Sequence, residues 1–282
     1  WNGISFIDMP PIPPTAISDV MPSPDGSVVF MACLDATGIH SLWRGNGLPN
    51  PGGWELVHIR SAAQFTGGTS LIRLSPEYGT DSTLYWFDWM GTTNIRKSTS
   101  NGQIWSGRTA PAAVWDACVE SADVLYVTDG GPGNVYPSTN GAWFFGLPVG
   151  PGIGAINDIA MAPSYPSLPV PGNILAAPAA AGPPCALSTD SAATWRPLLS
   201  PVAGATVVQI IADADYANNN TVYIGSATPG QGIYRYEIGT SSAWELIDAF
   251  PGYTTAWGVA VFARACTGLA MVEGTSILYG SW

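Results

Sequence analysis

The sequence predicts an all-β fold, a six-bladed β-propeller, and three observations lead to that prediction. Two segments align without a gap at an offset of 138 residues, Leu74–Tyr85 and Ala212–Tyr223. A tryptophan follows a small polar turn five times along the chain, at Trp54, Trp105, Trp143, Trp195 and Trp244. The apolar segments between these turns are short and rich in β-branched and aromatic residues. Repetition at this spacing is typical of propellers.

Each repeat of about 47 residues is expected to form four short strands, as blades of propellers do. The first strands are predicted at Asp19–Met21, Leu71–Leu74, Asp116–Cys118, Asp158–Met161, Gln209–Ile211 and Val259–Phe262. The second strands are predicted at Val28–Met31, Thr83–Phe87, Val124–Val127, Ile174–Ala176, Thr221–Ile224 and Leu269–Val272. The third strands are predicted at Ile39–Trp43, Asn94–Ser98, Asn134–Ser138, Cys185–Ser188, Ile233–Tyr236 and Ile277–Ser281. The fourth strand begins at the tryptophan.

The two ends of the chain are expected to share one blade. The sixth repeat stops after its third strand, and Trp1 precedes Asp19 by about the distance that separates Trp54 from Leu71. The opening residues would then supply the missing fourth strand and close the ring without an open sheet edge. The prediction is one domain, 1–282, with blades at 17–60, 70–110, 114–150, 155–202, 207–250 and 256–282 plus 1–9.

Composition limits the partners. Only 10% of the residues are charged, the net charge is −11, and Lys97 is the only lysine. Such a surface cannot neutralise a row of phosphates, which excludes nucleic acid and disfavours anionic membranes. No apolar run is long enough for a transmembrane helix. With 46% hydrophobic residues, including 12 tryptophans, the chain can bury a core.

Four cysteines, Cys33, Cys118, Cys185 and Cys266, lie too far apart in sequence for a zinc site. Two disulfides in any of three pairings, or four buried thiols, are both consistent with this spacing. The two histidines, His40 and His58, are expected on repeat strands as packed or surface residues rather than as metal ligands. The start at Trp1 suggests a processed chain or a portion of a longer one.

Three of the polar turns share a residue pattern that gives the chain a family resemblance. Ser188, Asp190, Thr194 and Trp195 occupy the conserved places of Ser-x-Asp-x-Gly-x-Thr-Trp, with Ala192 at the glycine. Ser98, Gly102 and Trp105 do the same, with Ser100 at the aspartate, and Ser138 to Trp143 reads as a shortened copy. These turns resemble the Asp-box of bacterial neuraminidase (BNR) repeats. In an Asp-box the polar side chains form hydrogen bonds with the turn backbone, and the tryptophan packs between blades.

The resemblance implies a propeller, and it covers several activities. Similar repeats occur in sialidases, xyloglucanase-type glycosidases, sortilin-like receptors, photosystem assembly factors and bacterial cell-surface proteins. The segment from Leu74 to Tyr85 is most similar to the cell-surface members. The sialidase site needs converging arginines, and the arginines of this chain are scattered over different strand positions. Sialidase activity is therefore excluded.

Three aspartates recur at one level of the predicted first strands, Asp19, Asp116 and Asp158. Three interpretations remain open. Each carboxylate accepts a bond from a neighbouring backbone amide, or the three bind calcium together with Asn157 or Gln209, or two of them act as the paired acids of a glycosidase. In the first interpretation there is no cofactor and no catalytic residue.

The function expected from these features is a non-catalytic extracellular or cell-surface propeller, a surface-layer, adhesion or scaffold module. Its partners would be other proteins or copies of itself, because a surface poor in charge packs with little repulsion. The alternative is a carbohydrate-binding or glycoside-hydrolysing propeller that uses the channel-mouth aspartates and exposed Trp86, Trp89, Trp115 or Trp257. A photosystem-assembly type of chaperone would need a basic patch, for which lysine and arginine are scarce.

Overall fold

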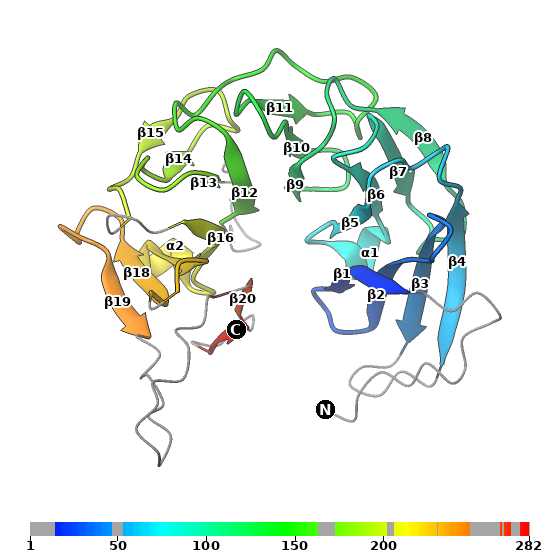
Figure 1. The fold of residues 1–282 in the computed structure, drawn as a ribbon, viewed down its shortest axis with the longest axis horizontal. Helices are drawn as coiled ribbons and strands as arrows, with labels where there is room; N and C mark the ends of the chain where they lie inside the picture. Colours follow the sequence, from blue (N-terminus) through cyan, green and yellow to red (C-terminus); the bar gives the residue numbers. More distant parts are fainter. Residues whose placement is uncertain are drawn as a thin grey trace. The chain divides into compact units, whose positions relative to one another are not determined.

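A computed structural model describes residues 15–46, 53–162, 173–201, 206–229, 231–248, 266, 268–271 and 277–281. The described chain is almost entirely β-structure, arranged as six antiparallel sheets (Figure 1). It divides into two compact units. The first comprises Trp1–Val127 and Tyr136–Leu147, and the second Thr128–Val135 and Pro148–Trp282.

The first unit contains two four-stranded sheets and most of a third, each a simple meander in chain order. The first sheet is β1 (Ala16–Pro22), β2 (Val28–Leu34), β3 (His40–Asn46) and β4 (Trp54–Arg60). The second is β5 (Thr69–Leu74), β6 (Leu84–Trp89), β7 (Asn94–Ser98) and β8 (Ser106–Thr109), and the third is β9 (Asp116–Val119), β10 (Leu125–Thr128) and β11 (Val135–Ser138).

The second unit continues the pattern with two complete sheets and one pair of strands. The fourth sheet is β12 (Ile156–Met161), β13 (Ile174–Pro178), β14 (Ala186–Ser188) and β15 (Arg196–Pro197). The fifth is β16 (Val207–Ala212), β17 (Thr221–Ser226), β18 (Ile233–Glu237) and β19 (Glu245–Asp248), and the last pair is β20 (Gly268–Met271) and β21 (Leu278–Ser281).

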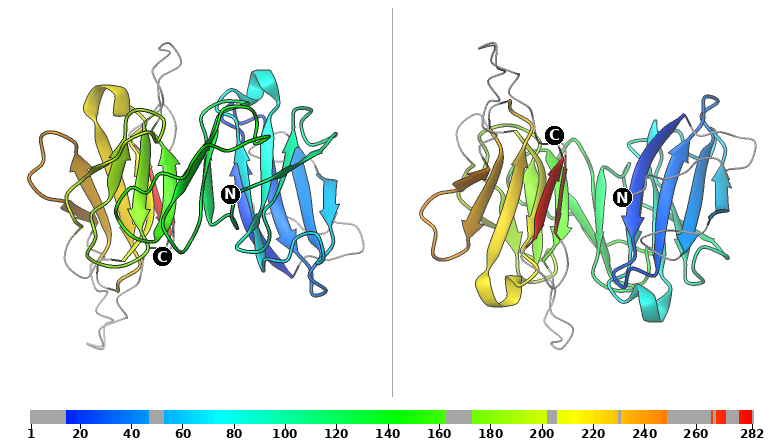
Figure 2. Two further views of the ribbon diagram at one scale, coloured as in Figure 1. Left: turned by 90° about the horizontal axis from the view of Figure 1, so that it is seen from above. Right: turned by 90° about the horizontal axis from the view of Figure 1, so that it is seen from below.

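The core lies between consecutive sheets. Phe30 and Leu42 of the first sheet pack against Ile72, Leu84 and Trp86 of the second, all fully buried. Figure 2 shows the first sheet (blue) facing the second (cyan) from two sides. Separate apolar clusters join the second sheet to the third and the fourth to the fifth. Inner strands such as β2, β6 and β10 are buried on both faces, which explains the short β-branched and aromatic segments of the sequence.

The two segments that align in sequence also fold alike. Each leaves a first strand, forms one helical turn, and enters the second strand: α1 (Tyr78–Asp81) before β6 and α2 (Tyr216–Asn219) before β17. Tyr78 and Tyr216 are buried at the start of each turn, and a left-handed residue, Ser82 or Asn220, ends it. The repeat read from the sequence is therefore a structural repeat.

The predicted division into four strands per repeat is wrong in two places. No fourth strand begins at Trp143; instead Gly146 donates to the Pro137 carbonyl at 2.7 Å and Val149 forms an isolated bridge with Val135. Leu269 lies in β20, which packs beside the first strand β16 and so holds the first-strand place rather than the second. Trp1–Ile7, Trp257 and Val259–Phe262 lie outside the described residues.

The cysteines are buried, and Cys33 and Cys185 are free thiols, so the chain does not form two disulfides. Burial raises the pKa of the Cys33 and Cys185 thiols to about 12, which keeps them protonated and unreactive at neutral pH. Within the described residues, no helix has the length and apolar character needed to cross a membrane.

Candidate functional site

In three sheets, the side chain at an equivalent position of the first strand accepts a hydrogen bond from the next sheet. The Asp19 carboxylate accepts from the Ile72 N–H at 2.8 Å, and the Asp158 carboxylate accepts from the Ile210 N–H at 2.8 Å. The Gln209 side-chain carbonyl accepts from the Leu269 N–H at 2.6 Å. Each of the three strands has a register shift directly before this residue, which re-aims its side chain. The repeat thus ties neighbouring first strands together.

Arg73 of β5 extends this arrangement to a third strand. Its Nη2 lies 2.5 Å from the Asp116 carboxylate, its Nη1 lies 3.2 Å from that of Asp19, and its Nε donates to the Ala117 carbonyl at 2.7 Å. The Asp116 side chain is 5% exposed and that of Arg73 21%. Burial raises the pKa of the Asp19 carboxyl and the Arg73 charge opposes that rise. One guanidinium therefore joins the first strands of three sheets.

The structure places the three aspartates singled out in the sequence in two different units. Asp19 and Asp116 lie in the first unit on either side of Arg73, and Asp158 lies in the second unit. Among the residues that the structure describes, no group of three acidic, histidine or cysteine side chains is placed to hold a metal ion. Chemically, the arrangement pairs one buried carboxylate, Asp116, and one partly buried carboxylate, Asp19, with the single cation of Arg73.

The three polar turns share one geometry, set by the serine that ends β7, β11 and β14. The hydroxyls of Ser98, Ser138 and Ser188 accept from the backbone N–H four residues on, at 2.9 to 3.0 Å. The side chain two residues after the serine accepts from the N–H of the seventh residue of the turn; these side chains are Ser100, Asn140 and Asp190. The third and fourth residues after each serine have positive φ.

This geometry changes the assignment of Trp143. The residue seven places after the serine is the one expected to pack between sheets, which we call the wedge position. It is Trp105 or Trp195 in two of the turns, and Phe145 in the turn that begins at Ser138. Phe145 packs against the apolar cluster between the second and third sheets. The turn that read as a shortened copy has full length, so Trp143 is not its wedge residue. Alignment on the serine rather than on the tryptophan would have revealed this from the sequence.

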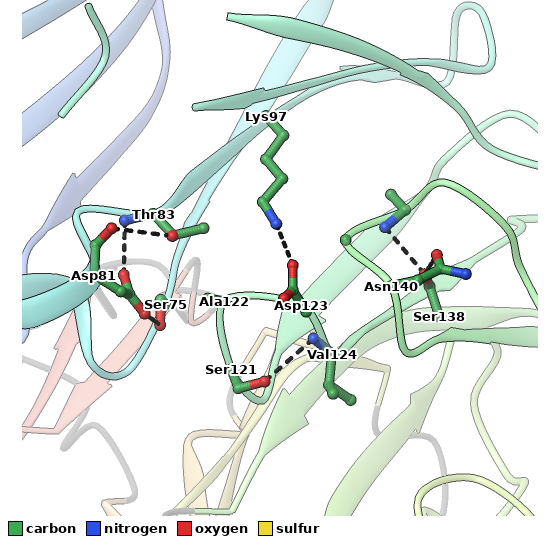
Figure 3. A network of polar contacts seen from close by, with 12 residues as sticks. Ser75, Asp81, Thr83, Lys97, Ser121, Ala122, Asp123, Val124, Ser138 and Asn140 are labelled. Atoms are coloured by element: carbon green, nitrogen blue, oxygen red, sulfur yellow. Dashed lines mark hydrogen bonds and ion pairs between the residues drawn. The ribbon is translucent and has the colours of Figure 1, made fainter. Parts of the chain in front are cut away.

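The turn that begins at Ser138 is fixed to the second sheet with the help of Lys97, the only lysine of the chain. The Lys97 Nζ of β7 lies 2.6 Å from the Asp123 carboxylate, and the Asp123 carbonyl accepts from the Gly141 N–H at 2.8 Å (Figure 3). Ser138 and Asn140, also drawn in Figure 3, bond each other inside the turn. Arg108 of β8 donates from Nε to the Gly141 carbonyl at 3.0 Å. The second sheet thereby holds the backbone of this turn.

The turn presents an exposed apolar surface, which we call the Trp143 surface: Trp143, Phe144 and Leu147. These side chains are 62%, 76% and 86% exposed. The Arg108 guanidinium stacks on the Trp143 ring, 3.7 Å from its centroid, which orders the indole by a cation–π contact. Large apolar residues grouped in this way, with an arginine, are typical of protein-binding surfaces. Sequence analysis missed this surface because it assigned Trp143 to the core.

Comparisons with known proteins give likeness of fold. No protein-family model matches the sequence, and no curated protein matches it. The structure of YCF48 bound to a D1 peptide is 13% identical with a TM-score of 0.56, covering 83% of this chain and 67% of that one. The structure of YCF48 from Cyanidioschyzon merolae is 12% identical with a TM-score of 0.59, covering 96% of this chain and 86% of that one. With the six antiparallel sheets, this likeness assigns the chain to the β-propeller fold.

The same comparison corrects the expected function and location. The similar structures are of YCF48, a photosystem assembly factor, so a surface-layer, adhesion or scaffold module is contradicted, as is a carbohydrate-binding or glycoside-hydrolysing propeller. An extracellular or cell-surface location is contradicted on the same ground. The segment that suggested it, Leu74–Tyr85, forms α1 and its flanking strands, where Asp81 accepts from Ser75 and Thr83. The residues of this segment shape the turn between two strands, and they do not indicate where the protein is located.

Proposed function

We propose that this protein binds a segment of a partner protein through the Trp143 surface. The observation that carries the proposal is the exposure of Trp143, Phe144 and Leu147 on a turn whose backbone is fixed. Ser138, Asn140 and Phe145 hold that turn from within, and Arg108 holds it from β8. A partner that buries these side chains therefore gains apolar contact without paying to order the backbone.

The likeness to a propeller that was solved with a bound peptide supports a peptide as the ligand. The charge distribution supports binding rather than hydrolysis, because Asp19 and Asp116 are paired with Arg73. Trp143 combines a large apolar ring with a stacked guanidinium, and tryptophan and arginine are the residues that most often dominate binding energy. We therefore assign Trp143 the central contact.

Selection of a phage-displayed library of random 12-residue peptides tests this proposal. We expect the wild-type protein to enrich peptides with apolar side chains, and we expect Trp143→Ala to weaken their binding about 30-fold or more, the loss of a hot-spot contact of about 2 kcal/mol. Fluorescence anisotropy of a labelled enriched peptide measures the affinity. The matched control is Ile104→Ala. Ile104 is 75% exposed and occupies the same position of the Ser98 turn that Phe144 occupies in the Ser138 turn. Equal affinity for wild type and Trp143→Ala, or no enrichment at all, would contradict the proposal.

We also propose that the three polar turns are Asp-box turns and that residues 1–9 add the outer strand of the last sheet, in which β20 and β21 hold the first two places. The shared serine geometry supports the first statement. The matching spacing of Trp1 to Asp19 and of Trp54 to Leu71 supports the second. Deletion of residues 1–9 should then lower the melting temperature by more than about 2 °C, the shift that 1 kcal/mol produces in a domain of this size. An unchanged melting temperature would contradict this closure.

A further inference from the structure

Four side chains from the first two sheets form a cluster of rings around one cation. His58 of β4 stacks on Trp105, with centroids 5.1 Å apart, and meets the Trp86 ring edge-on at 5.7 Å. Trp86 and Trp105 lie 6.2 Å apart. Arg96 of β7 stands directly opposite Trp86 of β6, so both side chains leave the same face of the sheet.

Each polar member of this cluster has a buried nitrogen without a hydrogen-bond partner. These atoms are Nε2 of His58, Nε1 of Trp86 and Nε of Arg96. The Trp86 side chain is fully buried, whereas His58 and Arg96 are half-buried, so a ligand would reach the cluster from the side of these two residues. Buried donors are nearly always satisfied in folded proteins. Three such nitrogens in one cluster indicate that an acceptor group belongs there.

The charge of the cluster is also uncompensated. Glu55, on the same strand as His58, pairs with Arg44. Asp88 of β6 accepts from backbone groups of Thr66, Gly67 and Thr92. Among the described residues no ion pair involves Arg96. Burial, and then the Arg96 charge, lower the pKa of His58, which keeps its ring neutral with one N–H to donate.

The backbone beside the cluster leaves room for the guanidinium. Gly107 of β8 stands opposite Arg96, and a Cβ at that position would lie 2.9 Å from the Arg96 Nη1. A side chain at 107 would therefore require the flexible end of the Arg96 side chain to shift. The glycine permits the arginine to reach this place, although no carboxylate of the described chain meets it there.

We propose that the cluster of His58, Trp86 and Arg96 is a binding site for a carboxylate. A carboxylate has two oxygens that accept several bonds at once, which matches a guanidinium and neighbouring N–H donors. It also neutralises the arginine, which a water molecule does not. The carboxylate of an aspartate or glutamate side chain, a peptide C-terminus and a free small acid share this chemistry. The site is separate from the Trp143 surface, and the proposal does not depend on it.

Titration of the whole protein, labelled with nitrogen-15, with sodium acetate tests the proposal. The indole N–H resonance of Trp86, assigned by its absence in Trp86→Phe, should move downfield and saturate as the acceptor arrives. Sodium chloride at equal ionic strength is the control for screening. N-acetylalanine and the amide of N-acetylaspartate distinguish a C-terminal from a side-chain carboxylate, and N-acetylalanine amide should have no effect. A resonance that acetate does not move, or that chloride moves equally, would overturn the proposal.

Arg96→Gln provides the matched test in the same titration. We expect its affinity for acetate to fall at least tenfold, while Arg235→Gln, which removes an exposed arginine paired with Glu245, should bind as the wild type does. If Arg96→Gln does not fold, Arg96→Lys gives the second variant, because it keeps the charge but loses the planar pair of N–H donors that fits a carboxylate. Unchanged acetate binding in a folded Arg96→Gln or Arg96→Lys protein would contradict the assignment of Arg96.

Discussion

Replacement of Arg73 by alanine should destabilise the protein by about 2–4 kcal/mol, one of the two largest effects that we predict. The substitution leaves the Asp116 carboxylate, 5% exposed, without its 2.5 Å partner, and it also removes the Arg73 contact to Asp19. The cost is that of a buried carboxylate that has lost its cation rather than the loss of one hydrogen bond. Urea unfolding followed by tryptophan fluorescence measures the free energy of unfolding.

The matched control is Arg235→Ala. The Arg235–Glu245 pair is also an ion pair of a guanidinium with a carboxylate, but it is more exposed, with side chains 49% and 60% exposed. Exposed pairs contribute about 0–1 kcal/mol, so this variant should unfold nearly as the wild type does. Equal losses in the two variants would show that Arg73 does not join the first strands as described.

The Arg73 effect should also depend on pH. The pKa of Asp19 is raised above 3.8 by burial, against the opposing charge of Arg73. A raised carboxyl pKa means that the folded state binds the proton more tightly than the unfolded chain, so stability from this group falls as pH rises from 3.8 through the raised value. Without Arg73 the pKa of Asp19 should rise further. The deficit of Arg73→Ala should therefore be larger at pH 7 than at pH 4.

Replacement of Asp88 by alanine should cost about 3 kcal/mol or more. This carboxylate is fully buried and accepts from the N–H groups of Thr66, Gly67 and Thr92, at 3.0, 2.9 and 2.6 Å. Its loss leaves the N–H groups of half-buried Gly67 and Thr92 without their acceptor, at about 1–3 kcal/mol each, whereas the N–H of exposed Thr66 turns to water. Thr66 and Gly67 lead into β5, which carries Arg73, so the change also loosens the strand that holds that guanidinium. Thermal and urea unfolding measure the loss.

Asp88→Asn and Asp25→Ala are the comparisons for this prediction. The asparagine keeps one acceptor oxygen, so its loss should be smaller than that of the alanine variant. Asp25 accepts from Ser23 and Ser27. After its removal the buried Ser23 hydroxyl keeps its bond to the Val28 carbonyl, and the groups of exposed Ser27 face water. An Asp88→Ala protein that is as stable as Asp25→Ala would refute the role given to this carboxylate.

The strands were predictable because their signal is local. Short runs such as Val28–Met31 and Thr221–Ile224 are rich in β-branched and aromatic residues, and both lie in strands. The position of Asp19 at a first strand was also readable, because the repeat aligned it with Asp158. The register shift that aims each of these carboxylates at the next sheet was not predictable, because it arises in the pairing of β1 with β2 and of β12 with β13 and has no signal in residue type.

The candidate binding surface could not be read from residue types alone. A tryptophan beside a polar turn is expected to be buried between sheets. Only the hydrogen bonds of Ser138 and Asn140 show that Phe145 takes that position and that Trp143 is left exposed. The contact of Arg108 with Trp143 joins residues on two sheets and has no sequence signal. The expected function failed for a related reason, since composition and blade motifs describe how a propeller is built and not what it binds.

Hydrogen exchange of the protein with and without an enriched 12-residue peptide tests the central claim most directly. The claim predicts new protection in residues 138–147, the turn that carries the Trp143 surface, and unchanged exchange in β1, β5 and β9, which carry Asp19, Arg73 and Asp116. Protection confined to β1, β5 and β9, with residues 138–147 exchanging as in the free protein, would contradict it.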